Sequence, residues 1–293
     1  MEKEGEGAHC LPYKHLLSCP FGVSPSQVSV VFHESFDRMS HSDHSLESSI
    51  SEIWDQRIQQ NTSLYNGKKF RYGGSVLDDG GGSSQEPHVC LHLGLTDYRS
   101  LPLPSSDACM CIFTWTFVGT NLNPSWQKFL VESEDDTIRC QHTSSPLGNG
   151  AVVETSDKKI LVLQRSNNVG EFPGHFVFPG GHPEKVSQEM FDSIIREVVE
   201  EIGVPAISLS TPVFIGISRR ELNVRPTAFF FIKCRLQSKE IQQHYCRAQD
   251  GYESTELFTV SASDLENMTP KMPGCHHGGF ALYKLMIEVA KDV

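Results

Sequence analysis

The segment Phe178–Val204, FPGGHPEKVSQEMFDSIIREVVEEIGV, constrains the fold more than any other part of this sequence. Two adjacent glycines predict a tight turn, and the residues after position 188 show the periodicity of an amphipathic helix. Gly203 follows the last periodic residue, which is where a glycine commonly ends a helix. The segment therefore predicts a turn followed by a helix that packs on a core through one face. The apolar residues of that face are Phe191, Ile194, Ile195, Val198 and Ile202.

The opposite face of the predicted helix is acidic. Glu197, Glu200 and Glu201 stand at i, i+3 and i+4, so their carboxylates lie within about one helical turn of each other. Like charges this close repel, and either solvation or a bound divalent cation can relieve the repulsion. Ligand sets made only of oxygen atoms suit Mg²⁺ or Mn²⁺, and Mg²⁺ is commonly shared between carboxylates and a substrate phosphate. The acidic face therefore has two interpretations, a solvated surface or a metal site.

Residues 178–204 resemble the Nudix box, a loop–helix motif of enzymes that hydrolyse nucleoside diphosphates linked to another group. The second half of the motif is intact as REVVEEIGV. The first half departs from the family pattern, since seven residues separate Gly181 from Glu189 and six separate Glu189 from Arg196. The resemblance implies that Arg196 orients a carboxylate of the box and that a box carboxylate accepts a proton from water. The residues implied to be catalytic are Arg196, Glu197, Glu200 and Glu201, with Mg²⁺ or Mn²⁺ on Glu197 and Glu201.

Further motifs along nearly the whole chain resemble one Nudix branch, the eukaryotic diphosphatases of UDP-glucose and UDP-galactose. The matching stretches are LLSCP (16–20), ISEIWDQR (50–57), KFR (69–71), LGLTDYR (93–99), FVGTN (117–121), PLGNGAV (146–152), PGGHPE (179–184) and EST (253–255). Two departures are an inserted segment, Ser100–Thr116, and a short loop after PGGHPE, Lys185–Gln188. The resemblance implies hydrolysis of a UDP-sugar to UMP and a sugar 1-phosphate. The substrate-binding residues that it implies are Tyr65, Tyr98, Arg165, Gly170, His182 and Glu184.

These implied substrate contacts also have plainer interpretations. Tyr65 and Tyr98 offer aromatic faces for uracil, although tyrosines also commonly fill cores. Arg165 suits a pyrophosphate through its guanidinium, whereas His182 and Glu184 follow the glycine turn, where side chains usually face solvent. Two other functions remain open. One is hydrolysis of another nucleoside diphosphate derivative such as ADP-ribose, and the other is a nucleotide-binding module with weak catalysis.

Strand-like segments precede and follow the acidic helix, which predicts a mixed sheet covered by helices. Together with the resemblance, this predicts an α/β fold, a Nudix-type α/β/α sandwich with a mixed sheet, at residues 146–293. A smaller α+β region at residues 1–145 precedes it and is expected to contribute to uridine binding. The acidic stretch Glu132–Asp136 favours a boundary near this point.

The expected elements follow from periodicity and turn residues. Helices are expected at 45–60, 123–132, 189–202, 238–245 and 279–289. Strands are expected at 15–19, 28–32, 88–95, 151–154, 159–165, 176–178, 213–217, 228–234 and 256–260. Two loops are also expected, a basic one that carries Arg219, Arg220 and Arg225, and a glycine-flanked one at Cys275–His277.

The 293-residue chain carries 25 Lys and Arg against 36 Asp and Glu, a formal net charge of −11. Such a chain lacks the broad basic surface that binds nucleic acid or anionic membranes, although a local basic cluster can still bind a small phosphorylated ligand. No apolar run is long enough to span a bilayer, and nine scattered cysteines without a zinc spacing favour reduced thiols. These features predict a soluble cytoplasmic protein, with the nucleus as a second compartment. The resemblance implies that its partner is a small-molecule nucleotide sugar. These features do not indicate an oligomeric state.

Overall fold

The computed structural model describes residues 12–60, 68–78, 87–97, 126–167, 169, 171–183, 188–245 and 254–292. The strands of its larger sheet are β1 (Tyr13–Val23), β5 (Gly148–Glu154), β6 (Ile160–Arg165), β7 (Phe176–Val177), β8 (Val213–Arg220), β9 (Arg225–Lys233) and β10 (Ser254–Val260). Their order is β1-β8-β9-β5-β6-β10, and β7 pairs with β6. β5 is parallel to β9, whereas the other pairs are antiparallel, so the sheet is mixed.

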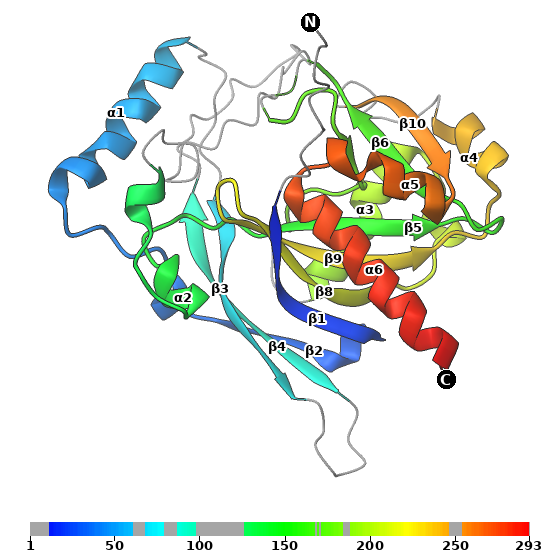
Figure 1. Cartoon of the computed structure of the whole chain (residues 1–293), viewed down its shortest axis with the longest axis horizontal. Helices are drawn as coiled ribbons and strands as arrows, with labels where there is room; N and C mark the ends of the chain where they lie inside the picture. Colours follow the sequence, from blue (N-terminus) through cyan, green and yellow to red (C-terminus); the bar gives the residue numbers. More distant parts are fainter. Residues whose placement is uncertain are drawn as a thin grey trace, which may run out of the picture.

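Helices cover both faces of this sheet. They are α3 (Gln188–Ile202) and α4 (Ser238–Tyr245) on one face, and α5 (Ala262–Met268) and α6 (Gly274–Asp292) on the other. Ala151 and Val153 pack under α3, while Val152 packs under α6, because alternate side chains of a strand point to opposite faces. Strands covered on both sides are therefore apolar at nearly every position. Figure 1 shows α6 in front of the strands and α3 behind them, which confirms the predicted α/β/α sandwich with a mixed sheet.

A smaller sheet comes from the N-terminal part of the chain. Its strand order is β2-β4-β3, with β2 parallel to β4 and β3 antiparallel to it. The elements of this part are β2 (Val28–Phe32), β3 (Lys68–Asp78), β4 (His88–Asp97), α1 (His44–Gln60) and α2 (Asp136–Arg139). Short 3₁₀ turns are η1 (Pro25–Gln27), η2 (Glu34–Phe36), η4 (Trp126–Phe129), η5 (Ala206–Ser208) and η6 (Thr269–Lys271).

The two sheets are connected through the backbone. β1 is the edge strand of the larger sheet and pairs with β8, although it lies in the region predicted to precede that sheet. The nitrogen of Leu147 donates to the carbonyl of Phe70 at 2.8 Å, and that of Tyr72 donates to the carbonyl of Ser145 at 3.1 Å. The larger sheet therefore takes its edge from the N-terminal part, and β3 pairs with the segment that leads into β5.

The predicted basic loop is wrong. β8 continues to Arg220 and β9 begins at Arg225, so the three arginines belong to strands and the chain reverses over residues 221–224. Val224 adopts a φ of 48°, which a turn this tight requires. The strands continue into charged residues because each buried arginine has a carboxylate partner. Charge in the sequence was an unreliable sign of exposure here.

The C-terminal helix begins earlier than predicted, so the expected loop at Cys275–His277 is also wrong. α6 starts at Gly274 and includes these residues in its first turn. Glycines usually weaken a helix, but here they allow a close approach to the sheet. A Cβ on Gly278 would lie 1.9 Å from Ser218 Oγ, and one on Gly279 would lie 2.3 Å from the ring of Phe229.

Two smaller differences lie in the N-terminal part. Where a helix is expected at 123–132, the described residues form only the 3₁₀ turn η4. β1 continues through Pro20 to Val23, beyond the expected end of this strand at residue 19, because an edge strand tolerates a proline at a register shift. None of the helices in the described part of the chain combines the length and apolar character that crossing a bilayer requires.

Candidate functional site

Helix α3 places its acidic face toward the glycine turn. Its predicted apolar face packs on the sheet, with Phe191, Ile194, Val198 and Ile202 buried and Ile195 partly buried. Gly203 ends the helix as predicted, with a φ of 81° and a hydrogen bond from its nitrogen to the carbonyl of Val199 at 2.8 Å. Because the apolar face fixes the rotation of the helix, Glu197 and Glu201 are directed to Gly180 and Gly181.

The glycine turn is held between β5 and α3. Ala151 donates its backbone N–H to the carbonyl that precedes Gly180, at 2.8 Å, and Asn149 donates to the carbonyl of Gly181 at 2.9 Å. On the other side, the nitrogen of Gly180 donates to Glu201 Oε2 at 2.9 Å. A Cβ on Gly180 would lie 2.2 Å from the carbonyl oxygen of Asn149, so no other residue fits there without displacing β5.

Glu197 lies directly against the second glycine of the turn. A Cβ on Gly181 would lie 2.1 Å from Glu197 Oε1 and 2.4 Å from its Cδ. The carboxylates of Glu197 and Glu201 therefore reach the same turn, one by van der Waals contact and the other by a hydrogen bond. The two glycines therefore allow the backbone of the turn to lie close to β5 and to these two carboxylates.

Asn149 is a positioning residue that the sequence patterns do not single out. Its side chain is buried, its Oδ1 accepts from the nitrogen of Gly181 at 2.9 Å, and its Nδ2 donates to Ser193 Oγ of α3 at 2.7 Å. It therefore connects β5, the turn and the helix. The signal in the sequence is a polar amide inside the otherwise small and apolar stretch PLGNGAV.

The two remaining candidates on α3 lie outside this contact. Glu200 is partly buried and forms no hydrogen bond or ion pair with the residues that the structure describes. Arg196 is half-exposed and forms an ion pair with Glu189 of the first helical turn. The partner of Arg196 in this ion pair is therefore the glutamate whose spacing departs from the family pattern.

Glu197 and Glu201 are the residues that could hold a metal. Over the described ranges, no group of three or more His, Cys, Asp or Glu side chains converges as a complete protein metal site. Two carboxylates side by side are nevertheless sufficient for Mg²⁺, which keeps several waters and takes further oxygens from substrate phosphates. The donor set is made of oxygen and is partly open to solvent, as that chemistry requires.

A cluster of buried and partly buried arginines lies beside the acidic face. Glu171, whose side chain is 12% exposed, pairs with Arg220 at 2.9 Å and 3.0 Å and with Arg225 at 2.9 Å. The guanidinium of Arg220 also lies over the ring of Phe172, 4.9 Å from its centroid. Phe172 has a φ of 50°, so the backbone at this point is held in a sparsely populated conformation.

The cluster includes two of the predicted substrate-binding residues. Arg165 Nε donates to the carbonyl of Glu171 at 3.0 Å, and Arg225 Nη2 lies 2.6 Å from His182 Nε2. Because an arginine can only donate, Nε2 of His182 accepts, and the ring is neutral with its proton on Nδ1. Arg165 and His182 are thus brought together by Glu171 and Arg225, two residues that periodicity did not single out.

Burial and charge shift the pKa values of this cluster. Burial raises the pKa of Glu171, but Arg220 and Arg225 outweigh it and hold the pKa below its ordinary value. Burial, then Arg225, Lys69 and Arg220, hold the pKa of His182 well below its usual range. The cluster therefore keeps Glu171 ionised and His182 neutral.

His276 of α6 adds a second neutral imidazole. Its Nδ1 accepts from the nitrogen of Phe178 at 3.1 Å, directly before the glycine turn. Burial lowers the pKa of His276 to about 3, with further contributions from Arg165, Arg220 and Arg225. The sequence patterns place this histidine in a loop and indicate no role for it.

The site places carboxylates and guanidinium groups within a few residues of one turn. Gly181 contacts Glu197, and the next residue, His182, contacts Arg225. Carboxylates can hold a divalent cation, and buried guanidinium groups can bind phosphate oxygens with two parallel hydrogen bonds. An anionic phosphate chain that bridges a metal and an arginine cluster fits this arrangement. The remaining predicted contacts, Tyr65, Tyr98, Gly170 and Glu184, lie outside the described residues, as do Ser100–Thr116 and most of the loop after PGGHPE.

A mixed sheet between two helical layers, with an acidic helix entered through a glycine turn, is the architecture of a Nudix domain. The family profile described as the NUDIX domain matches residues 145–273. Nudix hydrolase 9 of Arabidopsis thaliana is 61% identical over 304 residues, which cover 96% of this chain and 93% of that protein. The chain belongs to the Nudix hydrolase family.

Two further comparisons describe more distant similarity. The uridine diphosphate glucose pyrophosphatase NUDT22 of Homo sapiens is 30% identical over 275 residues, which cover 86% of this chain and 84% of that protein. The solved structure of a C. elegans Ap4A hydrolase binary complex covers 49% of this chain and 98% of its own, with 18% identity and a TM-score of 0.36.

Proposed function

We propose that this chain is a Mg²⁺-dependent hydrolase that cleaves the pyrophosphate of UDP-sugars, UDP-glucose and UDP-galactose, to UMP and a sugar 1-phosphate. The observation that carries the proposal is the position of Glu197 and Glu201 next to a buried arginine cluster, on two sides of one glycine turn. The 30% identity to the human UDP-glucose pyrophosphatase over most of both chains supports a UDP-sugar as substrate.

Glu197 and Glu201 would hold Mg²⁺, with Mn²⁺ as a substitute, because both ions prefer carboxylate oxygens. When bound, the ion neutralises phosphate charge and lowers the pKa of a coordinated water. Glu200 is the box carboxylate with an unengaged side chain among the described residues, so it is the one we assign as proton acceptor. Arg196 acts on the start of the helix through Glu189.

Arg165 and His182 would contact the phosphates or the sugar, together with Gly170 and Glu184. The arginines are held by Glu171 before a substrate arrives, so little reorganisation is needed to orient the phosphate oxygens. His182 stays neutral over the physiological range, and its Nε2 accepts a hydrogen bond from Arg225. These side chains therefore position the pyrophosphate, and the acidic face supplies the reactive water.

Uridine selectivity is assigned to the N-terminal part, through Tyr65 and Tyr98. The supporting observation is that β3 pairs with the segment that leads into β5. The nitrogen of Leu147 donates to the carbonyl of Phe70 at 2.8 Å, and two residues later the nitrogen of Asn149 donates to the carbonyl of Gly181 at 2.9 Å. The smaller sheet therefore lies next to the strand that holds the glycine turn. Removing residues before Leu147 would be a poor test, because it deletes β1 from the larger sheet. Tyr65→Ala and Tyr98→Ala, each compared with the Phe variant, test stacking without that loss.

A hydrolysis panel tests the proposed function. Purified protein is incubated with UDP-glucose, UDP-galactose, ADP-glucose, GDP-glucose, ADP-ribose and a dinucleoside polyphosphate, with Mg²⁺ and with chelator, and the products are separated by ion-exchange chromatography. We expect UMP and sugar 1-phosphate from the two UDP-sugars, at the highest kcat/KM of the panel and only with metal. A higher kcat/KM for ADP-ribose or another base would replace the assigned substrate. Nucleotide binding without turnover would indicate a binding module instead.

A further inference from the structure

Phe172 has an unusual backbone conformation beside the arginine cluster. Its φ is 50°, a region that bulky side chains rarely adopt, and the residue that follows, Pro173, also favours extended values at this position. Such conformations cost energy that contacts elsewhere must offset, and they are concentrated at ligand sites. The contacts of Phe172 therefore indicate what its conformation serves.

The chain on both sides of Phe172 is fixed by hydrogen bonds. His175 donates its backbone N–H to the carbonyl of Phe172 at 3.2 Å, across Pro173 and Gly174, and the φ of this glycine is 71°. A proline followed by a glycine with positive φ is typical of a type II turn. On the other side, Arg165 Nε donates at 3.0 Å to the carbonyl of the residue before Phe172. Both peptide groups that flank Phe172 are thus held in place.

The backbone at Phe172 directs two consecutive side chains to one guanidinium group. In an extended chain, neighbouring side chains point to opposite sides. Here the carboxylate of Glu171 accepts from Arg220 Nη2 at 2.9 Å and 3.0 Å, and Arg220 Cζ lies over the ring of Phe172, 4.9 Å from its centroid. Because φ sets the direction of the preceding peptide relative to the side chain, the left-handed value brings both groups to the same side.

Arg220 is held by three neighbours and keeps one donor. Its Nε donates to Asn223 Oδ1, its Nη2 donates to Glu171, and its Cζ lies over the ring of Phe172. Its Nη1 forms no hydrogen bond with a described residue, and it is not among the buried side-chain atoms of the described ranges that lack a partner. Nη1 therefore keeps accessible surface, although the side chain as a whole is only 4% exposed.

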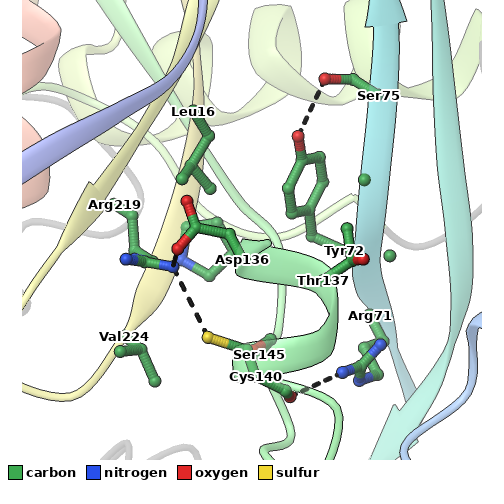
Figure 2. Close-up of a pocket in the computed structure, with 13 residues that line it drawn as sticks. Leu16, Arg71, Tyr72, Ser75, Asp136, Thr137, Cys140, Ser145, Arg219 and Val224 are labelled. Atoms are coloured by element: carbon green, nitrogen blue, oxygen red, sulfur yellow. Dashed lines mark hydrogen bonds and ion pairs between the residues drawn. The ribbon is translucent and has the colours of Figure 1, made fainter. Parts of the chain in front are cut away.

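Arg219, the preceding residue of β8, has a different environment. Its side chain points to α2, where Nη1 donates to Asp136 Oδ1 at 3.0 Å (Figure 2). A second ion pair through Nε gives this arginine two carboxylate partners. Arg220, in contrast, shares the carboxylate of Glu171 with Arg225. Two guanidinium groups on one carboxylate leave an excess of positive charge, which the charge of a phosphate can balance.

We propose that Phe172 is a positioning residue for the substrate, because it orients the guanidinium of Arg220 so that Nη1 donates to a phosphate oxygen. This inference rests on the proposed function, in which the arginine cluster holds the pyrophosphate. Phe172 acts through Arg220 and does not touch the reacting atoms. Since the ring and the ion pair order the guanidinium before a substrate arrives, binding does not have to order it.

Calorimetric titration of the full-length protein with inorganic pyrophosphate, in metal-free buffer, measures anion binding without hydrolysis, base or sugar. Phe172→Leu replaces the ring with an aliphatic side chain, and Phe172→Tyr keeps the ring. Phe172→Gly removes the ring and adopts a φ of 50° without strain, so it covers the case in which Phe172→Leu does not fold. Phe176→Leu is the matched control, because the ring of Phe176 packs against that of Phe258, with centroids 5.5 Å apart, and not against an arginine.

We expect the Kd for pyrophosphate to rise about tenfold in Phe172→Leu and Phe172→Gly, and to change less than about threefold in Phe172→Tyr and the control. With UDP-glucose, the first two variants should raise KM by a similar factor with a smaller effect on kcat, since Arg220 holds the phosphate in the ground state and the transition state alike. Pyrophosphate binding as tight as that of wild type in a folded Phe172→Leu or Phe172→Gly variant would overturn the proposal. Absence of pyrophosphate binding in wild type would overturn it as well.

Arg220→Lys tests whether Phe172 acts through Arg220. The lysine keeps a positive charge beside Glu171 but has no planar group to orient. In the Arg220→Lys background, Phe172→Leu should therefore cause no further rise in Kd, whereas additive losses would contradict the assignment. If wild type and the variants bind pyrophosphate in the expected pattern but wild type hydrolyses no UDP-sugar, the role of Phe172 stands and the proposed substrate fails.

Discussion

The acidic face of α3 and the arginine cluster around Glu171 are neighbours, but the sequence specifies them in different ways. The three glutamates lie within residues 197–201 of one helix and are partly exposed. The arginines come from β6, β8 and β9, and Arg220 is buried. A helix alone creates the first group, whereas only the assembled sheet creates the second. Like charges at a partly solvated surface cost little, but a buried guanidinium group requires a carboxylate in contact.

The largest effect is expected from removing the charges of the acidic face. Glu197→Gln or Glu201→Gln should lower turnover by roughly 1,000-fold, about 4 kcal/mol, because each removes an anionic metal ligand. Stability in metal-free buffer should be unchanged or higher, since repulsion is relieved and the amide oxygen introduced by Glu201→Gln can still accept from the nitrogen of Gly180. Steady-state kinetics at saturating Mg²⁺ and thermal unfolding measure both. Near wild-type turnover in either variant would contradict the metal assignment. Glu256→Gln, on an exposed part of β10, is the control.

Removing the carboxylate of the arginine cluster should lower the stability of the folded protein. Glu171→Gln leaves the buried Arg220 and the partly buried Arg225 without a carboxylate and should cost about 3 kcal/mol of unfolding free energy at pH 7. The folded pKa of Glu171 is depressed, so its contribution is present above the unfolded pKa of about 4.3 and is lost as the pH falls through the folded pKa. The difference between wild type and variant should therefore shrink in acid. Urea titrations at several pH values test this.

Glu189→Gln is the matched control for Glu171→Gln, because it breaks the half-exposed ion pair with Arg196. Such exposed pairs contribute less than about 1 kcal/mol. Equal losses in the two variants would contradict the distinction between a buried cluster and a partly solvated face.

Gly181→Ala should act on the acidic face without removing a charge. Its new Cβ would collide with the carboxylate of Glu197, a side chain that can move aside, so the fold should persist while the ligand is displaced. We expect kcat to fall by about 10- to 100-fold, because small displacements at a reacting centre are costly. Gly148→Ala is the control, since its nearest contact would be an ordinary 3.4 Å from Thr227 Oγ1. Equal activity of the two variants would remove Gly181 from the site.

The smallest expected effect is on the pH dependence of folding stability, through the neutral histidine beside the arginine cluster. Burial lowers the folded pKa of His276 to about 3. Below about pH 6.5, the unfolded chain therefore binds a proton at this histidine, whereas the folded chain does not bind one there until the pH is near 3. Stability should therefore fall as the pH drops through this window, by up to about 1.4 kcal/mol per pH unit for this group. His276→Asn should flatten the slope of denaturant-derived stability between about pH 6.5 and 4.5. An unchanged slope, equal to that of the exposed control His44→Asn, would contradict the assignment.

The fold and the acidic face could be predicted because they depend on local patterns. Apolar runs such as Ala151–Val153 predict strands buried on both faces, and the spacing from Phe191 to Ile202 fixes which side of α3 carries the glutamates. The two glycines predict the turn, but the contact of Gly181 with Glu197 depends on how β5 places that turn.

The residues that were missed act through partners distant in sequence. Asn149 contacts Ser193, Glu171 contacts Arg220 and Arg225, and His276 contacts Phe178. In the sequence each is a single polar residue whose spacing carries no information about its partner. Charge was misleading for Arg220, because a buried ion pair and a solvated loop have the same composition.

The pairing of β1 with β8 affects how the chain folds during its synthesis. Tyr13 pairs with Arg220, and Ser18 pairs with Gly216. At a synthesis rate of about 5–20 residues per second, the first strand leaves the ribosome roughly 10–40 s before the strand that completes it. Until then Leu17 and Val23, buried in the finished sheet, have no core to enter. The nascent chain thus exposes an unpaired apolar strand for most of its synthesis, and this long-range pairing should make closure of the sheet a late and slow step.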